Sequence, residues 1–201
     1  MQSQTSINLL ECRSCRRLTN QFKRLRVEYP DYWNRPVPAC GPEDASILVV
    51  GLAPGLKGAN RTGIPFSGDA SGDLLNATLD RLSLRDEVRI TNAVKCLPIR
   101  NLPSGREVKS CSKHLLPELQ AHACQPSGVV IALGGVAHRA ILSSLGLRQK
   151  DHVFSHHAVH ELPGFLLIDT YHCSRYNTQT GRLTPAMFEG VFRTAAEHAA
   201  A

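Results

Sequence analysis

Side chains suited to binding a planar polar ligand stand in or just after apolar runs of this sequence. Residues 51–72, GLAPGLKGANRTGIPFSGDASG, follow the run ILVV and place Phe66 and Asp69 in glycine-rich backbone. Glycine lets the backbone approach a ligand closely and adopt positive φ angles at little cost. Asn92 lies near the end of a later apolar run, and His172 follows another. An aromatic ring, a carboxylate, an amide and an imidazole together indicate a pocket for such a ligand.

The order of the apolar runs indicates an α/β fold. Runs at 47–50, 88–94, 128–133 and 165–170 predict buried parallel strands, and the spacing of apolar residues predicts helices over 73–82, 108–123, 135–145 and 185–199. Thr184 is the expected N-cap of the last helix, before Pro185. Alternating strands and helices form a parallel sheet covered on both faces, whose ligands bind beyond the carboxyl ends of the strands. Residues 1–45 lie outside this alternation, and we expect this N-terminal arm to wrap the edge of the sheet.

Composition sets broad limits on the class of protein. The 201 residues are 42% hydrophobic and 20% charged, which fits one globular domain over residues 1–201. The net charge of +6 suits a polyanionic partner. We find no secretory signal and no apolar run of membrane-spanning length, so we expect a cytoplasmic protein without a membrane partner.

Reduced cytoplasmic thiols favour metal ligation over disulfides for the seven cysteines. Cys12 and Cys15 can chelate one metal centre, and Cys96 with Cys111 would complete four thiolates, which suit zinc or an iron–sulfur cluster. The alternative is a set of inert buried thiols. Cys40 is a further candidate ligand.

Four motifs together resemble those of the uracil-DNA glycosylase superfamily. They are GLAPG, NRTG-x-PFSGDASG, TNAVKC, and H-x-S-x-x-N followed by TGRLT, and the resemblance covers roughly residues 10–195. Family 5 is the most similar branch, because the related family 4 usually has an acid where this chain has Leu52. The resemblance implies a three-layer α/β/α sandwich around a four-stranded parallel sheet. It also implies a structural 4Fe–4S cluster held by Cys12, Cys15, Cys96 and Cys111.

The implied activity is hydrolysis of the N-glycosidic bond of uracil in DNA, by base flipping, as the first step of base excision repair. Hypoxanthine, xanthine and ethenocytosine are further expected substrates. Phe66 would stack on the flipped base, Asn92 would read its edge, and His172 would bond its O2. Gly51 and Ala53 would line the base site. Core packing for Phe66, a strand-end cap for Asn92 and a structural role for His172 are the alternatives.

The group that activates water is an open question in this sequence. Ala53 stands where many superfamily members have a polar residue, so Asp69 is the candidate catalytic acid. The alternative is that Asp69 caps the following helix. A catalytically silent iron–sulfur protein that binds uracil-containing DNA is the second hypothesis, and a zinc-stabilised nucleotide hydrolase is the third.

Residues 174–184 correspond to the loop that would enter the minor groove of DNA. Cys173 and Arg175 replace the two prolines usual in the family, which puts the rigidity of this loop in question. The candidate DNA-binding residues are Arg175, Tyr176, Asn177 and Arg182. We expect a monomer associated with the nucleoid. The four histidines at positions 152, 156, 157 and 160 are expected to be ordinary hairpin or surface residues.

Overall fold

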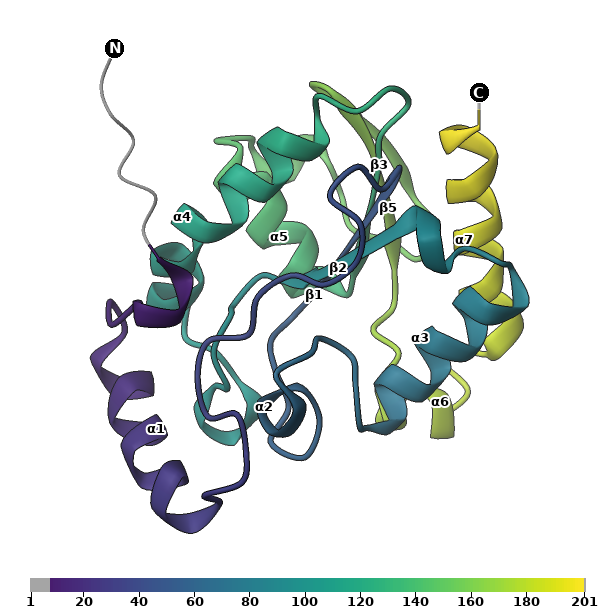
Figure 1. Cartoon of the computed structure of the whole chain (residues 1–201). Coiled ribbons are helices and arrows are strands. Elements are labelled where there is room, and N and C mark those ends of the chain that lie inside the picture. Colours follow the sequence, from purple (N-terminus) through teal and green to yellow (C-terminus); the bar gives the residue numbers. More distant parts are fainter. Residues whose placement is uncertain (1–7, 201) are drawn as a thin grey trace.

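A five-stranded sheet in the order β2-β1-β3-β5-β4 forms the centre of the molecule. The computed structural model describes residues 8–200 (Figure 1). The parallel strands are β1 (Ile47–Gly51), β2 (Val88–Asn92), β3 (Val129–Leu133) and β5 (Phe165–Thr170), and β4 (Val159–Leu162) pairs antiparallel with β5. The helices are α1 (Arg16–Glu28), α2 (Ala59–Thr62), α3 (Ala70–Arg81), α4 (Gly105–His122), α5 (Gly135–Ser144), α6 (Arg175–Gln179) and α7 (Pro185–Ala199). Short 3-10 turns are η1 (Leu9–Glu11), η2 (Arg85–Glu87), η3 (Ile99–Asn101) and η4 (Gln149–Asp151).

The predicted α/β/α layers and the four parallel strands are confirmed, and the sheet has one more strand than expected. β4 was missed because its four residues, VHEL, include two polar ones and are mostly not buried at the sheet edge. A central parallel strand, in contrast, is apolar on both faces. The fifth strand brings the segment before β5 back along the sheet, as a hairpin.

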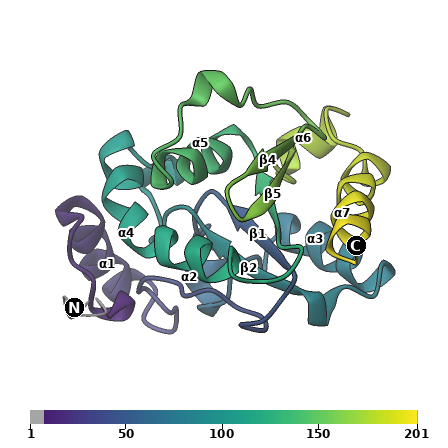
Figure 2. The ribbon, with the colours of Figure 1, turned by 90° about the horizontal axis from the view of Figure 1, so that it is seen from above.

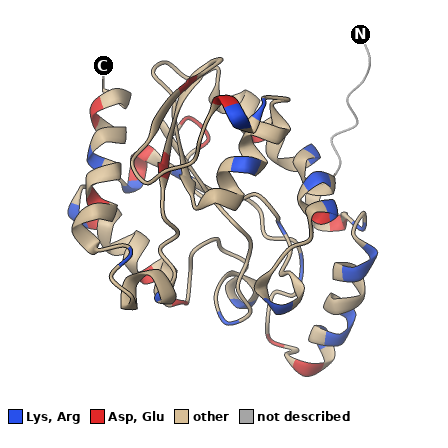
Figure 3. Ribbon diagram, turned by 180° about the vertical axis from the view of Figure 1, so that it is seen from behind, with Lys and Arg blue, Asp and Glu red and all other residues tan. Residues whose placement is uncertain are grey.

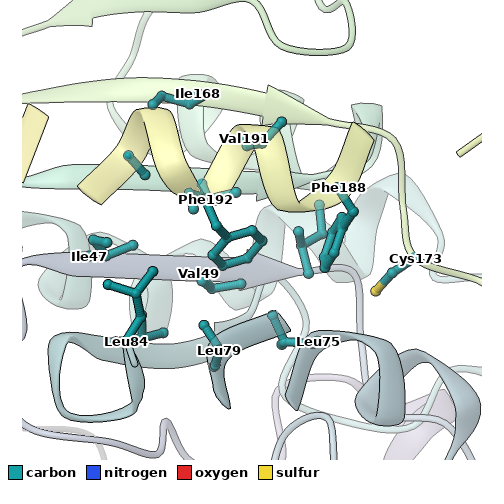
Figure 4. Packing of buried hydrophobic residues seen from close by; sticks show 14 of the residues in the cluster. Ile47, Val49, Leu75, Leu79, Leu84, Ile168, Cys173, Phe188, Val191 and Phe192 are labelled. Carbon is teal, nitrogen blue, oxygen red and sulfur yellow. The ribbon is translucent and has the colours of Figure 1, made fainter. Parts of the chain in front are cut away.

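Alternate side chains of β1 enter two separate cores. Ile47 and Val49 pack with residues of α3 and α7, whereas Leu48 and Val50 pack with residues of α4 and α5. Figure 4 shows the first core, in which Phe188 of α7 lies between the helix and the sheet. Seen from above, the two pairs of helices lie on opposite sides of the sheet (Figure 2). This period of two is the pattern of a strand buried on both faces.

The last helix follows its sequence signals closely. The Thr184 side chain accepts a hydrogen bond from the Met187 N–H at 3.2 Å, and Pro185 occupies the first helical position. Proline lacks the N–H that would have no partner there, so it favours the helix start.

The N-terminal arm wraps the β2 edge of the sheet, as predicted. Cys40 and Ile90 exchange two backbone hydrogen bonds of 2.9 and 2.7 Å. The arm also contains α1, which was not predicted and buries Leu18, Phe22 and Leu25 on one face. The other residues of this helix include many Lys and Arg side chains (Figure 3). Within residues 8–200, we find no helix with the length and apolar character needed to cross a membrane.

Candidate active site at the carboxyl ends of the strands

A cavity of about 540 Å³ opens at the carboxyl ends of the parallel strands. Its lining comes from the segments that follow β1, β2, β3 and β5, and includes Ala53, Phe66, Asp69, Asn92 and His172. A cavity of this size lies in the range typical of small-molecule and cofactor sites. The structure therefore brings together the side chains that the sequence singled out, although they are far apart along the chain.

Phe66 belongs both to the cavity wall and to the hydrophobic core. It is 9% exposed and packs with the α3–α7 core. Its φ angle is +52°, a conformation that costs energy for a bulky residue and is often found at functional sites. The Asn76 side chain donates to the Phe66 carbonyl at 3.1 Å, and this bond helps to hold the turn. Phe66 therefore lines the cavity and packs in the core at the same time, so its two expected roles are compatible.

Asn92 ends β2 with its side chain in the cavity wall. The residue is 3% exposed, and its Oδ1 is buried without a hydrogen-bond partner in the structure. A buried acceptor left without a partner costs about 1–3 kcal/mol, which a ligand donor could recover. Gly51 faces it from β1, where an added Cβ would lie 2.5 Å from Asn92 Oδ1 and 2.6 Å from the Phe66 ring. Glycine is thus the residue that this close approach allows.

His172 follows β5 and lies near Phe66, with ring centroids 6.2 Å apart. Its Nδ1 is buried and has no partner within the described structure. Burial lowers the pKa of His172 below its ordinary value of 6.5, and the Asp69 carboxylate partly opposes this shift. The imidazole is therefore neutral near pH 7 and can donate one N–H. The Asn177 side chain donates to the His172 carbonyl at 2.8 Å and fixes the backbone there.

Asp69 caps α3 and lines the cavity at the same time. Its Oδ1 accepts the Gly72 N–H at 3.0 Å, the cap that was considered as an alternative role. Its Oδ2 lies against the backbone of Gly58, where an added Cβ would be only 2.1 Å away. One carboxylate oxygen thus accepts a hydrogen bond from the helix, and the other lies against Gly58. Ala53 also lines the cavity and supplies no polar side-chain atom.

The segment 174–184 contains a short helix, α6, instead of the expected loop. The Ser174 side chain accepts the Asn177 N–H at 3.4 Å and caps the helix. Cys173 is 1% exposed, and its thiol donates to the Ser71 carbonyl at 3.5 Å, so this residue anchors the segment in the core. Tyr176 is 71% exposed, and Arg175 is exposed beside it.

Arg182 lies at the cavity wall, where its guanidinium is 4.5 Å from the centre of the Tyr171 ring. The wall around Tyr171 was missed from the sequence. His156 stacks on this ring with centroids 5.1 Å apart, and Phe154 and Asn101 are further lining residues. Tyr171 could have been found from its place directly after β5. Phe154 and Asn101 come from irregular segments without a periodic pattern, so no local signal marks them.

The four cysteines singled out by their spacing converge on one recess. Cys12, Cys15, Cys96 and Cys111 line it together. Burial raises the pKa of both Cys96 and Cys111, and the other cysteines of the group raise it further. Cys40 is exposed on the β2 edge and is absent from this lining.

Comparison with known proteins agrees with the geometry of this site. The pattern of the uracil DNA glycosylase superfamily matches residues 38–196. A type-5 uracil-DNA glycosylase of Thermus thermophilus is 41% identical, covering 90% of this chain and 90% of the relative. Type-5 enzymes of Pyrobaculum aerophilum and Mycobacterium leprae are 41% and 39% identical, covering 95% and 92% of this chain and 90% of each relative. The chain therefore belongs to the uracil-DNA glycosylase superfamily and, within it, to the type-5 family.

Proposed function

We propose that this glycosidase of the type-5 family removes uracil from DNA by hydrolysing its N-glycosidic bond. The observation that carries the proposal is the pair of buried polar atoms without partners, Asn92 Oδ1 and His172 Nδ1, in one cavity with the Phe66 ring. A flipped base would supply the missing partners and a flat face for stacking. The basic chain, with a net charge of +6, favours a polyanionic substrate.

Base selection would come from the Asn92 amide. Its Oδ1 would accept from uracil N3–H and its Nδ2 would donate to O4. Cytosine presents an acceptor at N3 and a donor at N4. A fixed amide would then place its acceptor Oδ1 against an acceptor and its donor Nδ2 against a donor. Such a mismatch leaves buried polar groups unpaired and can discriminate strongly between substrates.

Bond cleavage places negative charge on the leaving base and positive charge on the sugar. The neutral His172 imidazole would donate to uracil O2 as the charge develops, and one lost donor of this kind typically costs 10²–10³-fold in rate. The free oxygen of Asp69 would orient the attacking water or stabilise the sugar cation. Ala53 offers no group for either task, so Asp69 is the acid that we assign to this step. No lysine is assigned as a nucleophile, and we propose a monofunctional hydrolase.

DNA would approach the cavity over α6. Tyr176 is the proposed wedge that fills the gap left by the flipped base, and Arg175 and Arg182 are proposed phosphate contacts. Asn177 would act through its bond to the His172 carbonyl. We also propose hypoxanthine, xanthine and ethenocytosine as substrates, since the cavity of about 540 Å³ is large and its wall at Tyr171 is aromatic.

The four-cysteine recess is proposed to hold a 4Fe–4S cluster. Four thiolates around one zinc ion would lie about 3.8 Å apart, given Zn–S bonds of about 2.3 Å. The group of ligand atoms that lie within 4.8 Å of one another in the described residues does not include these sulfur atoms, and the choice of a cluster over zinc rests on membership of the type-5 family. The cluster would link the N-terminal arm to α4 structurally. Iron and sulfide analysis tests it: Cys96→Ser should lose iron, whereas Cys40→Ser should retain it.

The decisive experiment for the activity is release of free uracil from labelled duplex DNA by purified, iron-loaded protein. We expect turnover in the wild type and at least 100-fold loss in Asn92→Ala and His172→Ala. His198→Ala, an exposed histidine of α7, is the matched control and should keep the wild-type rate. Binding of uracil-containing DNA without any uracil release would instead support the catalytically silent alternative. The same assay with hypoxanthine, xanthine and ethenocytosine in the DNA tests the wider substrate range.

A further inference from the structure

A buried group of two imidazoles and a carboxylate lies beside the wall of the cavity. His138 Nδ1 of α5 is 2.8 Å from Asp169 Oδ1 of β5, and His160 Nε2 of β4 is 3.0 Å from Asp169 Oδ2. The His138 side chain is 1% exposed, that of His160 is 12% exposed, and that of Asp169 is fully buried. Their ligand atoms all lie within 4.8 Å of one another. His160 lies in the β4–β5 hairpin, and its imidazole contacts the buried Asp169 carboxylate.

The contacts of His138 show that a second proton or a metal ion belongs in this group. Its Nε2 lies 2.9 Å from the His152 carbonyl oxygen, which can only accept, so Nε2 carries the hydrogen. A neutral imidazole then has a bare lone pair at Nδ1, which faces a carboxylate oxygen at 2.8 Å. Two acceptors at this distance repel each other unless a second proton or a metal ion lies between them.

We propose that His138 Nδ1, His160 Nε2 and the Asp169 carboxylate bind a divalent first-row transition-metal ion, with zinc as the test ion. Imidazole and carboxylate are donors that such ions prefer. A metal-bound histidine normally donates its other N–H to a carbonyl or carboxylate, as His138 does to His152.

The required movement is small. Ligand atoms around a tetrahedral zinc ion at 2.0–2.1 Å lie about 3.3 Å apart. Whichever Asp169 oxygen binds the ion, its contact of 2.8 or 3.0 Å with an imidazole nitrogen would open slightly, and the other distances among the three ligand atoms would close from within 4.8 Å. The partly exposed side of His160 leaves a place for water as the fourth ligand.

The position of this site gives it a structural consequence for the cavity. Asp169 precedes Tyr171 and His172 on the same segment, and both line the cavity. The Phe154 ring, another lining residue, meets the His138 ring edge-on with centroids 5.6 Å apart. A bound ion would join α5, β4 and β5 and so stiffen this wall. The proposal does not depend on the activity proposed above.

Metal titration of the purified protein tests this site. Chelator-treated wild type should bind one Co²⁺ outside the cysteine recess, with visible absorption bands but without the charge-transfer band of a cobalt–thiolate bond. At a zinc concentration of 100 times Kd, the melting temperature should rise by roughly 5–10 °C. His160→Gln and Asp169→Asn should abolish both signals. His157→Gln changes an exposed neighbour bonded to Thr194 and should keep them.

Two results would overturn the proposal. One is wild-type protein with neither the cobalt bands nor a thermal shift, which would leave a second proton as the cation between His138 and Asp169. The other is His160→Gln protein that binds the ion as well as the wild type does. If Asp169→Asn fails to fold, His160→Gln decides the question, because its side chain lies at the partly exposed rim of the group.

Discussion

Gly51→Ala tests whether the close approach of β1, Asn92 and Phe66 shapes the base site. The added Cβ would lie 2.5 Å from Asn92 Oδ1 and 2.6 Å from two atoms of the Phe66 ring. Ordinary contacts are about 3.5 Å, so both side chains must move by about 1 Å. The β1 backbone resists such a movement, because it is paired with β2 at Gly51 and with β3 up to Val50. A misplacement of about 1 Å can cost 10²-fold in rate.

Single-turnover uracil release and thermal unfolding measure the two consequences of this change. We expect a rate about 100-fold below wild type, together with a loss of about 1–3 kcal/mol in stability from overpacking. Gly105→Ala is the matched control: an added Cβ meets no heavy atom within 4 Å, so both rate and stability should stay close to wild type. A folded Gly51→Ala protein with the wild-type rate would refute the reasoning.

Three further changes separate chemistry from structure. Asp69→Asn should keep the α3 cap and the melting temperature yet lose activity. Asp69→Ala should lose activity and also about 1 kcal/mol of the free energy of unfolding, because the cap is removed. Equal activity of Asp69→Asn and wild type would argue against a catalytic carboxylate. Because the pKa of His172 is lowered on folding, its contribution to stability is present above pH 6.5 and is lost as the pH falls. Urea unfolding should therefore show a weaker acid dependence in His172→Gln; an unchanged dependence would contradict this. Glu118→Gln should destabilise the folded protein by about 3–5 kcal/mol, because the fully buried Lys95 Nζ, 2.6 Å from Glu118, would lose its counter-charge. A loss below about 1 kcal/mol in urea unfolding would show that the ammonium finds another partner.

The elements of the fold that could be predicted were those with a strong local pattern of apolar and capping residues. The parallel strands and α7 were predictable because apolar runs, Thr184 and Pro185 act within a few residues of one another. β4 and α1 were not, since an edge strand with polar residues and a helix with a basic face carry weak signals. Their formation depends on pairing with β5 and on burial of Leu18 and Phe22 by distant segments.

The sequence by itself determined which side chains follow the strand ends, and therefore that Phe66, Asp69, Asn92 and His172 would meet at one edge of the sheet. Only the tertiary structure decided how each is held: the shared cap and cavity position of Asp69, the buried unpaired atoms of Asn92 and His172, and the anchoring of Cys173. It also decided the meeting of His138, His160 and Asp169. The reason is physical, because the place of each strand along the chain follows from short-range apolar patterns, whereas contacts between side chains depend on the packing of segments far apart in the chain.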